Sequence, residues 1–135
     1  MADRGATVHI PGTVIDAVLA HAAADAPREA CGLLIGAGSE VHRAVRARNV
    51  ARGPARYRVA AEDHFAAIRA ARSEGLDVVG GYHSHPATAA EPSATDRATA
   101  FADFVFVIAT LVPHPHLRAW AFADGNFTER PLVRT

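Results

Sequence analysis

The segment from Asp77 to Asp96 restricts the possible folds of this chain more than any other part of the sequence. Its first residues, 77–82 (DVVGGY), have the apolar character of a buried strand. If the extended backbone continues, the two-residue period of a strand points His83 and His85 to the same face. The fold must therefore accommodate a buried strand that presents two imidazoles side by side.

Asp96 can supply a third ligand beside the two histidines. Two nitrogens and one carboxylate oxygen form a donor set that zinc accepts at roughly 2.0–2.2 Å. Three protein ligands leave a fourth position for water, and zinc lowers the pKa of such a water to about 7. The spacing therefore predicts a catalytic site with one Zn²⁺ ion and a bound water as the fourth ligand.

The same residues also allow a purely structural interpretation. An H-x-H pair on a strand is a weak signal by itself, and residues 93–96 (SATD) fit a helix capping box. Asp96 would then be only a cap. The two interpretations are partly compatible, because a helix that begins at Ser93 would direct Asp96 toward the strand end that carries the histidines.

Glu29 lies at the start of a second apolar strand, in residues 27–36 (PREACGLLIG). A carboxylate within hydrogen-bond reach of an activated water can take its proton and later pass it to a leaving amine. Glu29 alone would equally suit an ordinary exposed strand end.

An acid in a P-x-E-x-C-G-L-L-x-G context, followed by H-S-H-P and then by a serine and an aspartate at fixed spacing, resembles the JAMM family of metallopeptidases. This family is also called MPN-plus or Mov34. The resemblance runs from about Thr7 to Leu132. It implies an α/β fold with a cytidine-deaminase-like arrangement of layers.

The resemblance also implies a role for each candidate residue. His83, His85 and Asp96 would bind zinc, Glu29 would act as general base and acid, and Ser93 would help to hold the tetrahedral intermediate. A hydroxyl near the metal can donate to an oxyanion, and loss of one such donor costs roughly 3–4 kcal/mol in studied hydrolases.

Members of this family cut the peptide or isopeptide bond after the Gly-Gly tail of ubiquitin or a ubiquitin-like protein. The chain is compact, and it is similar to small prokaryotic members that act on ubiquitin-fold sulfur carriers, for example by releasing a carboxyl-terminal cysteine. Two alternatives stay open, namely an isopeptidase that deconjugates ubiquitin-like proteins and a binding module for such proteins without catalysis.

Other zinc enzymes are less compatible with the sequence. A nucleobase deaminase needs a P-C-x-x-C signature, whereas this chain has one cysteine, Cys31, inside the apolar strand. Helical zinc peptidases need H-E-x-x-H, which is absent. We expect Cys31 to be a buried structural residue.

Length and charge give further expectations. A chain of 135 residues, half of them apolar, predicts one domain over residues 1–135. Its 14 basic and 14 acidic residues cancel, which argues against nucleic acid or an acidic membrane as the main partner. With no long apolar run and a single cysteine, we expect a cytoplasmic protein; its oligomeric state cannot be predicted.

Periodicity and chain breakers favour an α/β fold with one mixed, curved sheet flanked by helices. The predicted helices cover residues 11–24, 61–74 and 93–101. The predicted strands cover residues 8–10, 30–36, 41–48, 57–59, 104–111, 117–123 and 127–132, together with the histidine strand that begins at 77.

Two features remain outside the predicted site. His114 and His116 form a second H-x-H pair, but the flanking prolines favour a surface turn. Six arginines fall between Glu40 and Glu62 without an intervening acid, at positions 43, 46, 48, 52, 56 and 58. They suit a solvated strand edge or a docking surface for an acidic partner protein.

Overall fold

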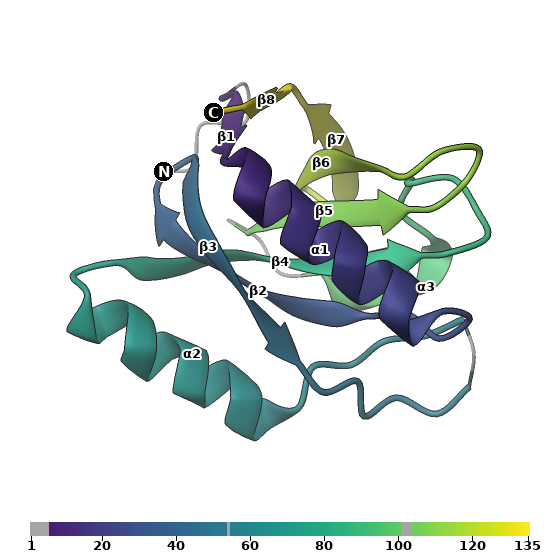
Figure 1. Ribbon diagram of the computed structural model, residues 1–135, viewed down its shortest axis with the longest axis horizontal. Helices are drawn as coiled ribbons and strands as arrows, with labels where there is room; N and C mark the ends of the chain where they lie inside the picture. Colours follow the sequence, from purple (N-terminus) through teal and green to yellow (C-terminus); the bar gives the residue numbers. More distant parts are fainter. Residues whose placement is uncertain (1–5, 54, 101–103) are drawn as a thin grey trace.

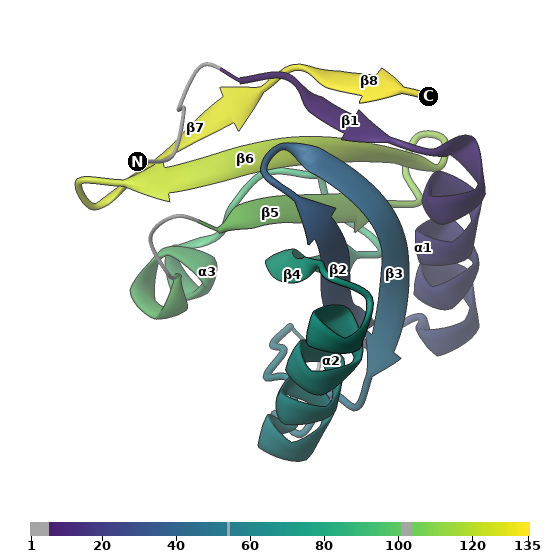
Figure 2. The same cartoon turned by 90° about the vertical axis from the view of Figure 1, so that its left-hand side faces the viewer.

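Eight strands of the described residues form one mixed sheet that curls on itself, with helices on both sides (Figures 1 and 2). The computed structural model describes residues 6–53, 55–100 and 104–135. The strands run in the order β7-β6-β5-β4-β2-β3-β1-β8. The elements are β1 (Val8–Ile10), α1 (Gly12–Asp25), β2 (Cys31–Ala37), β3 (Glu40–Ala47), α2 (Ala61–Ser73), β4 (Asp77–His85), α3 (Ala94–Thr99), β5 (Val105–Thr110), β6 (His116–Ala123), β7 (Asn126–Arg130) and β8 (Leu132–Arg134).

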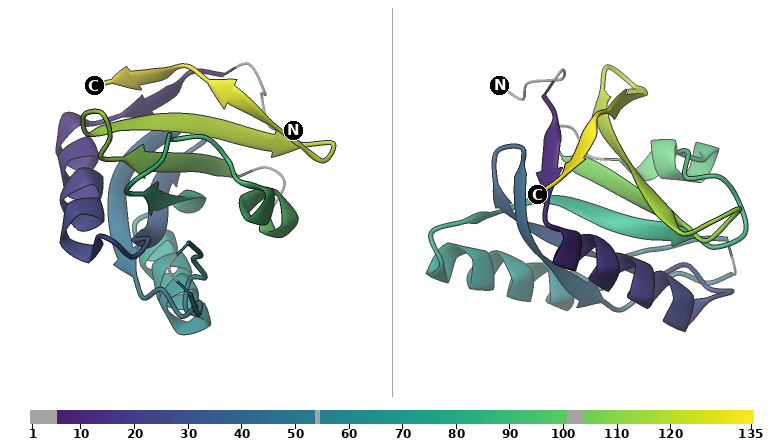
Figure 3. Two further views of the ribbon diagram at one scale, coloured as in Figure 1. Left: turned by 90° about the vertical axis from the view of Figure 1, so that its right-hand side faces the viewer. Right: turned by 45° about the horizontal axis from the view of Figure 1, so that its top comes forward.

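The curvature follows from the connection at the end of the chain. β7 pairs with β6 at one end of the sheet, whereas β8 pairs in parallel with β1 at the other end. Only Pro131 separates these two strands in the sequence, so the two ends of the sheet must lie close together. Figure 3 shows β8 beside β1, and the sheet is nearly closed.

Helix α1 covers one face of the sheet and forms the main core with it. Val14, Val18 and Ala22 of α1 are buried at helical spacing and pack with Leu34 and Tyr82 of the sheet. Full burial of a valine or leucine side chain contributes about 1.5–3 kcal/mol, so this packing stabilises the fold.

The opposite face carries α2 and the predicted site. Ala67 and Ala71 are the buried residues of α2, and their small side chains let the helix approach β2 and β4 closely. Because neighbouring residues of a strand point to opposite faces, Tyr82 faces α1 while His83 points the other way. Gly32 lies opposite Tyr82, and a Cβ at this position would clash with the ring of the tyrosine.

The structure confirms the predicted fold class, one mixed curved sheet with flanking helices. The prediction of a strand at residues 57–59 is wrong, since the segment forms only a single bridge between Asn49 and Val59. The side chain of Asn49 supplies the missing partner, because its Oδ1 accepts from the backbone N–H of Arg58 at 3.0 Å.

A second correction concerns the end of the chain. The predicted strand 127–132 is two strands, because Pro131 lacks an N–H group and the chain changes partner there, from β6 to β1. The predicted end of the third helix at Phe101 falls outside the described residues. Within the described segments, no helix is long and apolar enough to span a membrane.

Candidate active site

The two histidines lie at the end of β4, in the middle of the sheet. β4 pairs with β2 on one side and with β5 on the other, and His83 lies directly opposite Cys31 in the first pair. His83 is 2% and His85 6% exposed. Burial between two neighbouring strands fixes both imidazoles, so their geometry is set by the sheet.

Three ligand atoms converge in front of this strand end. Nε2 of His83 lies 3.2 Å from Nε2 of His85, and Oδ2 of Asp96 lies 3.1 Å and 3.2 Å from these two nitrogens. Zinc bonds of about 2.0–2.1 Å in a tetrahedron place neighbouring ligand atoms about 3.3–3.4 Å apart. The triangle therefore has the size of one face of a tetrahedral zinc site.

The second nitrogen of His85 provides a test of whether a metal fits. Its Nδ1 lies 3.1 Å from the carbonyl oxygen of Ala89, and because a carbonyl can only accept, Nδ1 must carry the proton. In the neutral form of His85 with its proton on Nδ1, Nε2 has a lone pair that can bind a cation. Such a backbone contact is the usual device that fixes the tautomer of a metal-binding histidine, so the residues fit a cation.

Asp96 has two structural roles at once. The backbone N–H of Ser93 donates to Oδ2 of Asp96 at 2.9 Å, and the N–H of Asp96 donates to Oγ of Ser93 at 3.0 Å. The predicted capping box is thus confirmed, and it directs the carboxylate toward the histidines. Burial alone would raise the pKa of Asp96, but its contacts with His83 and His85 hold that pKa well below its usual range.

Glu29 is the fourth polar residue of the site. A carboxylate oxygen of Glu29 and one nitrogen each of His83 and His85 lie within 4.8 Å of one another. Glu29 is 7% exposed, and its Oε1 has no hydrogen-bond partner among the described residues. Burial raises the pKa of this carboxyl to about 7, an effect that His85 opposes. A buried acceptor without a partner indicates a position for a proton-bearing group that the protein does not supply.

Two residues that the sequence analysis did not assign to the site hold the backbone around Glu29. Oγ of Ser84, between the two histidines, accepts from the N–H of Ala30 at 2.8 Å, and the N–H of Ser84 donates to the carbonyl of Ala30 at 3.0 Å. Nδ2 of Asn49 donates to the carbonyl of Glu29 at 2.9 Å. Glu29 is thereby fixed relative to the strand that carries the histidines.

Tyr57 covers the imidazole of His83 and was also missed. The two rings stack with centroids 4.1 Å apart and an angle of 13° between their planes. Asn49 holds this loop in place through Nδ2, which donates to the carbonyl of Arg56 at 3.0 Å. The only sequence signal was an aromatic residue among arginines, which has no spacing rule that connects it to His83.

The loop between β4 and α3 is anchored to the sheet. Oγ1 of Thr110 donates to the carbonyl of Thr88 at 2.6 Å, and Nε1 of Trp120 donates to the carbonyl of Ala90 at 3.1 Å. These bonds fix the path of the chain from His85 to the first turn of α3. Asp96 is therefore held beside the histidines although the segment between β4 and α3 contains no helix or strand.

The structure brings four of the five predicted site residues together, namely Glu29, His83, His85 and Asp96. The fifth, Ser93, borders the site through its bonds with Asp96. Cys31 is fully buried, and burial raises the pKa of its thiol to about 12, as expected of a structural cysteine. His114 is exposed in a bend before β6 and lies outside this group.

Comparisons with known proteins agree with this architecture. Residues 11–123 match the family model described as prokaryotic homologs of the JAB domain. The chain is 38% identical over 128 residues to the CysO-cysteine peptidase of Mycobacterium tuberculosis, covering 91% of this chain and 88% of that protein. It is 37% identical over 124 residues to the Desampylase of Haloferax volcanii, covering 84% and 86%.

Solved structures show the same fold. Protein DSY2949 from Desulfitobacterium hafniense superimposes with a TM-score of 0.86 at 28% identity, covering 95% of this chain and 92% of that one. The JAB1/MPN domain protein AF2198 from Archaeoglobus fulgidus superimposes with a TM-score of 0.61 at 19% identity, covering 96% and 100%. With a family model that spans most of its length, the chain belongs to the prokaryotic homologs of the JAB domain.

Proposed function

We propose that this protein is a zinc-dependent peptidase that hydrolyses the bond after the carboxyl-terminal Gly-Gly of a ubiquitin-like sulfur-carrier protein. The observation that carries the proposal is the triangle of His83, His85 and Asp96 ligand atoms beside the buried, unpartnered Oε1 of Glu29. The names of the mycobacterial and haloarchaeal relatives support a hydrolase that acts on such carriers.

The chemistry divides among the residues of the site. When bound by His83, His85 and Asp96, zinc supplies a Lewis acid and favours ionisation of water. Glu29 takes one proton from the attacking water while the oxygen of that water bonds to the carbonyl carbon of the last glycine. The C–N bond then breaks, and Glu29 returns the proton to the leaving amine.

We expect Ser93 to assist this step. Its Oγ accepts from the N–H of Asp96, which leaves the hydroxyl proton free to donate to the developing oxyanion. His83 and His85 come from β4, and Glu29 lies two residues before the start of β2. Ser93 and Asp96 lie at the start of α3. The proposed reaction therefore depends on these three segments holding their relative positions.

Glu29→Gln tests the proposal most directly. The substrate is a ubiquitin-fold sulfur carrier extended by cysteine after Gly-Gly, and its mass is followed with and without a chelator. We expect the wild type to remove cysteine in a chelator-sensitive manner, and Glu29→Gln to bind zinc with the wild-type stoichiometry but lose cleavage by at least about 100-fold. Glu40→Gln, an exposed carboxylate at the start of β3, is the matched control. Normal cleavage by Glu29→Gln would show that the base is assigned wrongly.

Isopeptide hydrolysis is the second candidate, because the relative named Desampylase is almost as similar to this chain as the relative named CysO-cysteine peptidase. A carrier joined through Gly-Gly to a lysine side chain, incubated in parallel, separates the two activities. If zinc binds and neither linkage is cut, the protein is instead a binding module for ubiquitin-like proteins.

A further inference from the structure

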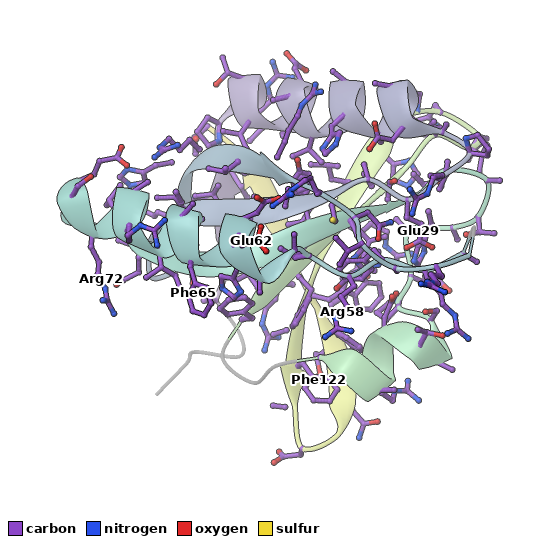
Figure 4. The ribbon with its side chains drawn as sticks, turned by 90° about the horizontal axis from the view of Figure 1, so that it is seen from below. Glu29, Arg58, Glu62, Phe65, Arg72 and Phe122 are labelled. Carbon is purple, nitrogen blue, oxygen red and sulfur yellow. The ribbon has the colours of Figure 1, made fainter. Side chains whose placement is uncertain are left out.

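Five exposed arginines surround the site, and we call them the arginine collar. Arg28 precedes Glu29, Arg97 follows Asp96, and the other three lie in the loop that carries Tyr57 onto His83. The collar consists of Arg28, Arg52, Arg56, Arg58 and Arg97. In Figure 4, the view from below, both Glu29 and Arg58 lie beyond the end of α2 that carries Glu62, on the side of α3.

The loop that carries three of the collar residues is fixed to the site. Nη2 of Arg28 donates to the carbonyl of Ala51 at 3.0 Å, and Oδ1 of Asn49 accepts from the N–H of Arg58 at 3.0 Å. Tyr57 points inward and stacks on His83, whereas its neighbours Arg56 and Arg58 are exposed. The positive charges therefore have a fixed position beside the site.

These charges are not paired with acids in the part of the chain that the structure describes. In the described ranges none of the five side chains makes an ion pair, whereas Arg43, Arg48 and Arg118 are paired with acids. The sequence has no acid between Glu40 and Glu62, and the two acids at the centre of the site, Glu29 and Asp96, are buried. A chain of zero net charge thus presents a positive rim at one place.

We infer that the arginine collar docks an acidic surface of the carrier protein around the root of its tail, an inference that rests on the proposed function. The site recognises a thin Gly-Gly tail, which offers few side-chain contacts. Charge complementarity on the body of the partner can supply both selectivity and a faster encounter, and steering of this kind raises association rates by about 10–10³-fold. One face of the Tyr57 ring stacks on His83, and the five collar residues include no aromatic side chain of the kind on which single-stranded nucleic acids stack.

The double variant Arg56→Glu/Arg58→Glu tests this docking surface. Its matched control is Arg69→Glu/Arg72→Glu, two exposed arginines of α2 without ion pairs in the described residues; Figure 4 shows Arg72 far from Glu29. Both variants are made in the Glu29→Gln background. The dissociation constant for a ubiquitin-fold sulfur carrier ending in Gly-Gly-Cys is then measured by isothermal titration at two salt concentrations.

We expect the collar variant to bind the carrier about tenfold more weakly, the control to bind like the parent, and added salt to weaken the parent more than the collar variant. Equal affinity of parent and collar variant, an equal loss in the control, or no binding of the carrier by the parent would overturn the inference. So would a single-stranded RNA 12-mer that binds the parent more tightly than the carrier does and loses affinity in the collar variant.

Cleavage of the carrier and of a six-residue peptide ending in Gly-Gly-Cys is measured separately with Glu29 intact. We expect the ratio of kcat/KM for the carrier to that for the peptide to fall about tenfold in the collar variant and to stay constant in the control. If neither substrate is cut although carrier binding depends on the collar, the proposed function fails and the docking surface stands. If both substrates are cut and the ratio of their kcat/KM values is unchanged in the collar variant, the proposed function stands and the docking surface fails.

Discussion

Replacing Asp96 by asparagine separates its proposed role as a zinc ligand from its role as a cap. The amide side chain would keep an oxygen that accepts from the N–H of Ser93, but it would lose the negative charge that faces the two histidines. Ser93→Ala is the complementary change, because it removes the cap oxygen and leaves the carboxylate. We therefore expect Asp96→Asn to lose stabilisation by zinc and keep its baseline stability. We expect Ser93→Ala to lose baseline stability and keep its stabilisation by zinc.

The size of each effect can be estimated. A ligand present at 100 times its dissociation constant stabilises the folded state by about 2.7 kcal/mol. For a domain of this length, 1 kcal/mol shifts Tm by about 3–4 °C, so zinc should raise the Tm of the wild type by about 8–10 °C. If loss of one ligand weakens zinc binding about 100-fold, the same zinc concentration stabilises Asp96→Asn by only about 0.4 kcal/mol, a shift of about 1–2 °C.

Ser93→Ala should behave in the opposite way. Loss of an N-cap oxygen costs about 0.5–2 kcal/mol, which lowers the baseline Tm by about 1.5–8 °C and leaves most of the zinc-induced rise. Calorimetric melting of chelator-treated protein, with zinc titrated back at concentrations fixed from the wild-type dissociation constant, measures both quantities. A wild-type zinc shift in Asp96→Asn, or loss of that shift in Ser93→Ala, would refute the assignment of Asp96 as a ligand.

Aromatic and histidine contacts in and behind the site support three further predictions. Tyr57→Ala should weaken zinc binding about tenfold by releasing the ring of His83, whereas Tyr57→Phe keeps the stack and should bind like the wild type in the same titration. Tyr82→Phe removes the hydroxyl that lies 2.7 Å from Nδ1 of His21 and should cost about 1–3 kcal/mol in urea unfolding, because the buried nitrogen loses its partner. Burial lowers the pKa of His21 below 6.5 although Asp25 opposes the shift, so the neutral form is favoured in the folded state; the stabilisation that His21 provides should be complete above about pH 6.5 and lost as pH falls through its folded-state pKa. His21→Gln should reduce the slope of unfolding free energy against pH below about pH 6.5. An unchanged slope would contradict a lowered pKa of His21.

The parts of the site that depend on short-range sequence were predictable. The two histidines share a face because they are two residues apart on one strand, and the capping box spans four consecutive residues. Glu29 could be placed only through its family context, since no local rule connects it to His83. The pairing of β2 with β4, which brings these residues together, was not predicted and is a finding of the structure.

The missed residues act across longer separations. Asn49 bonds the carbonyl of Glu29, which lies 20 positions earlier, and an isolated asparagine before a loop carries no signal for that contact. Tyr57 stacks on a ring 26 positions later. The strand β8 was missed because Pro131 is compatible with continuation of an edge strand, and only closure of the sheet onto β1 explains the change of partner.

The backbone around Glu29 links the register of the sheet to the position of the base. Two hydrogen bonds between Ala30 and Ser84 extend the β2–β4 pairing to the residue before the start of β2. Nδ2 of Asn49 donates to the carbonyl of Glu29. A one-residue slip of β4 would turn both histidines to the face of α1 and would also break the bonds with Ala30. The same hydrogen bonds therefore fix the candidate ligands and the candidate base. The fold itself thus holds the buried oxygen of Glu29, which has no hydrogen-bond partner among the described residues, beside the nitrogens of His83 and His85.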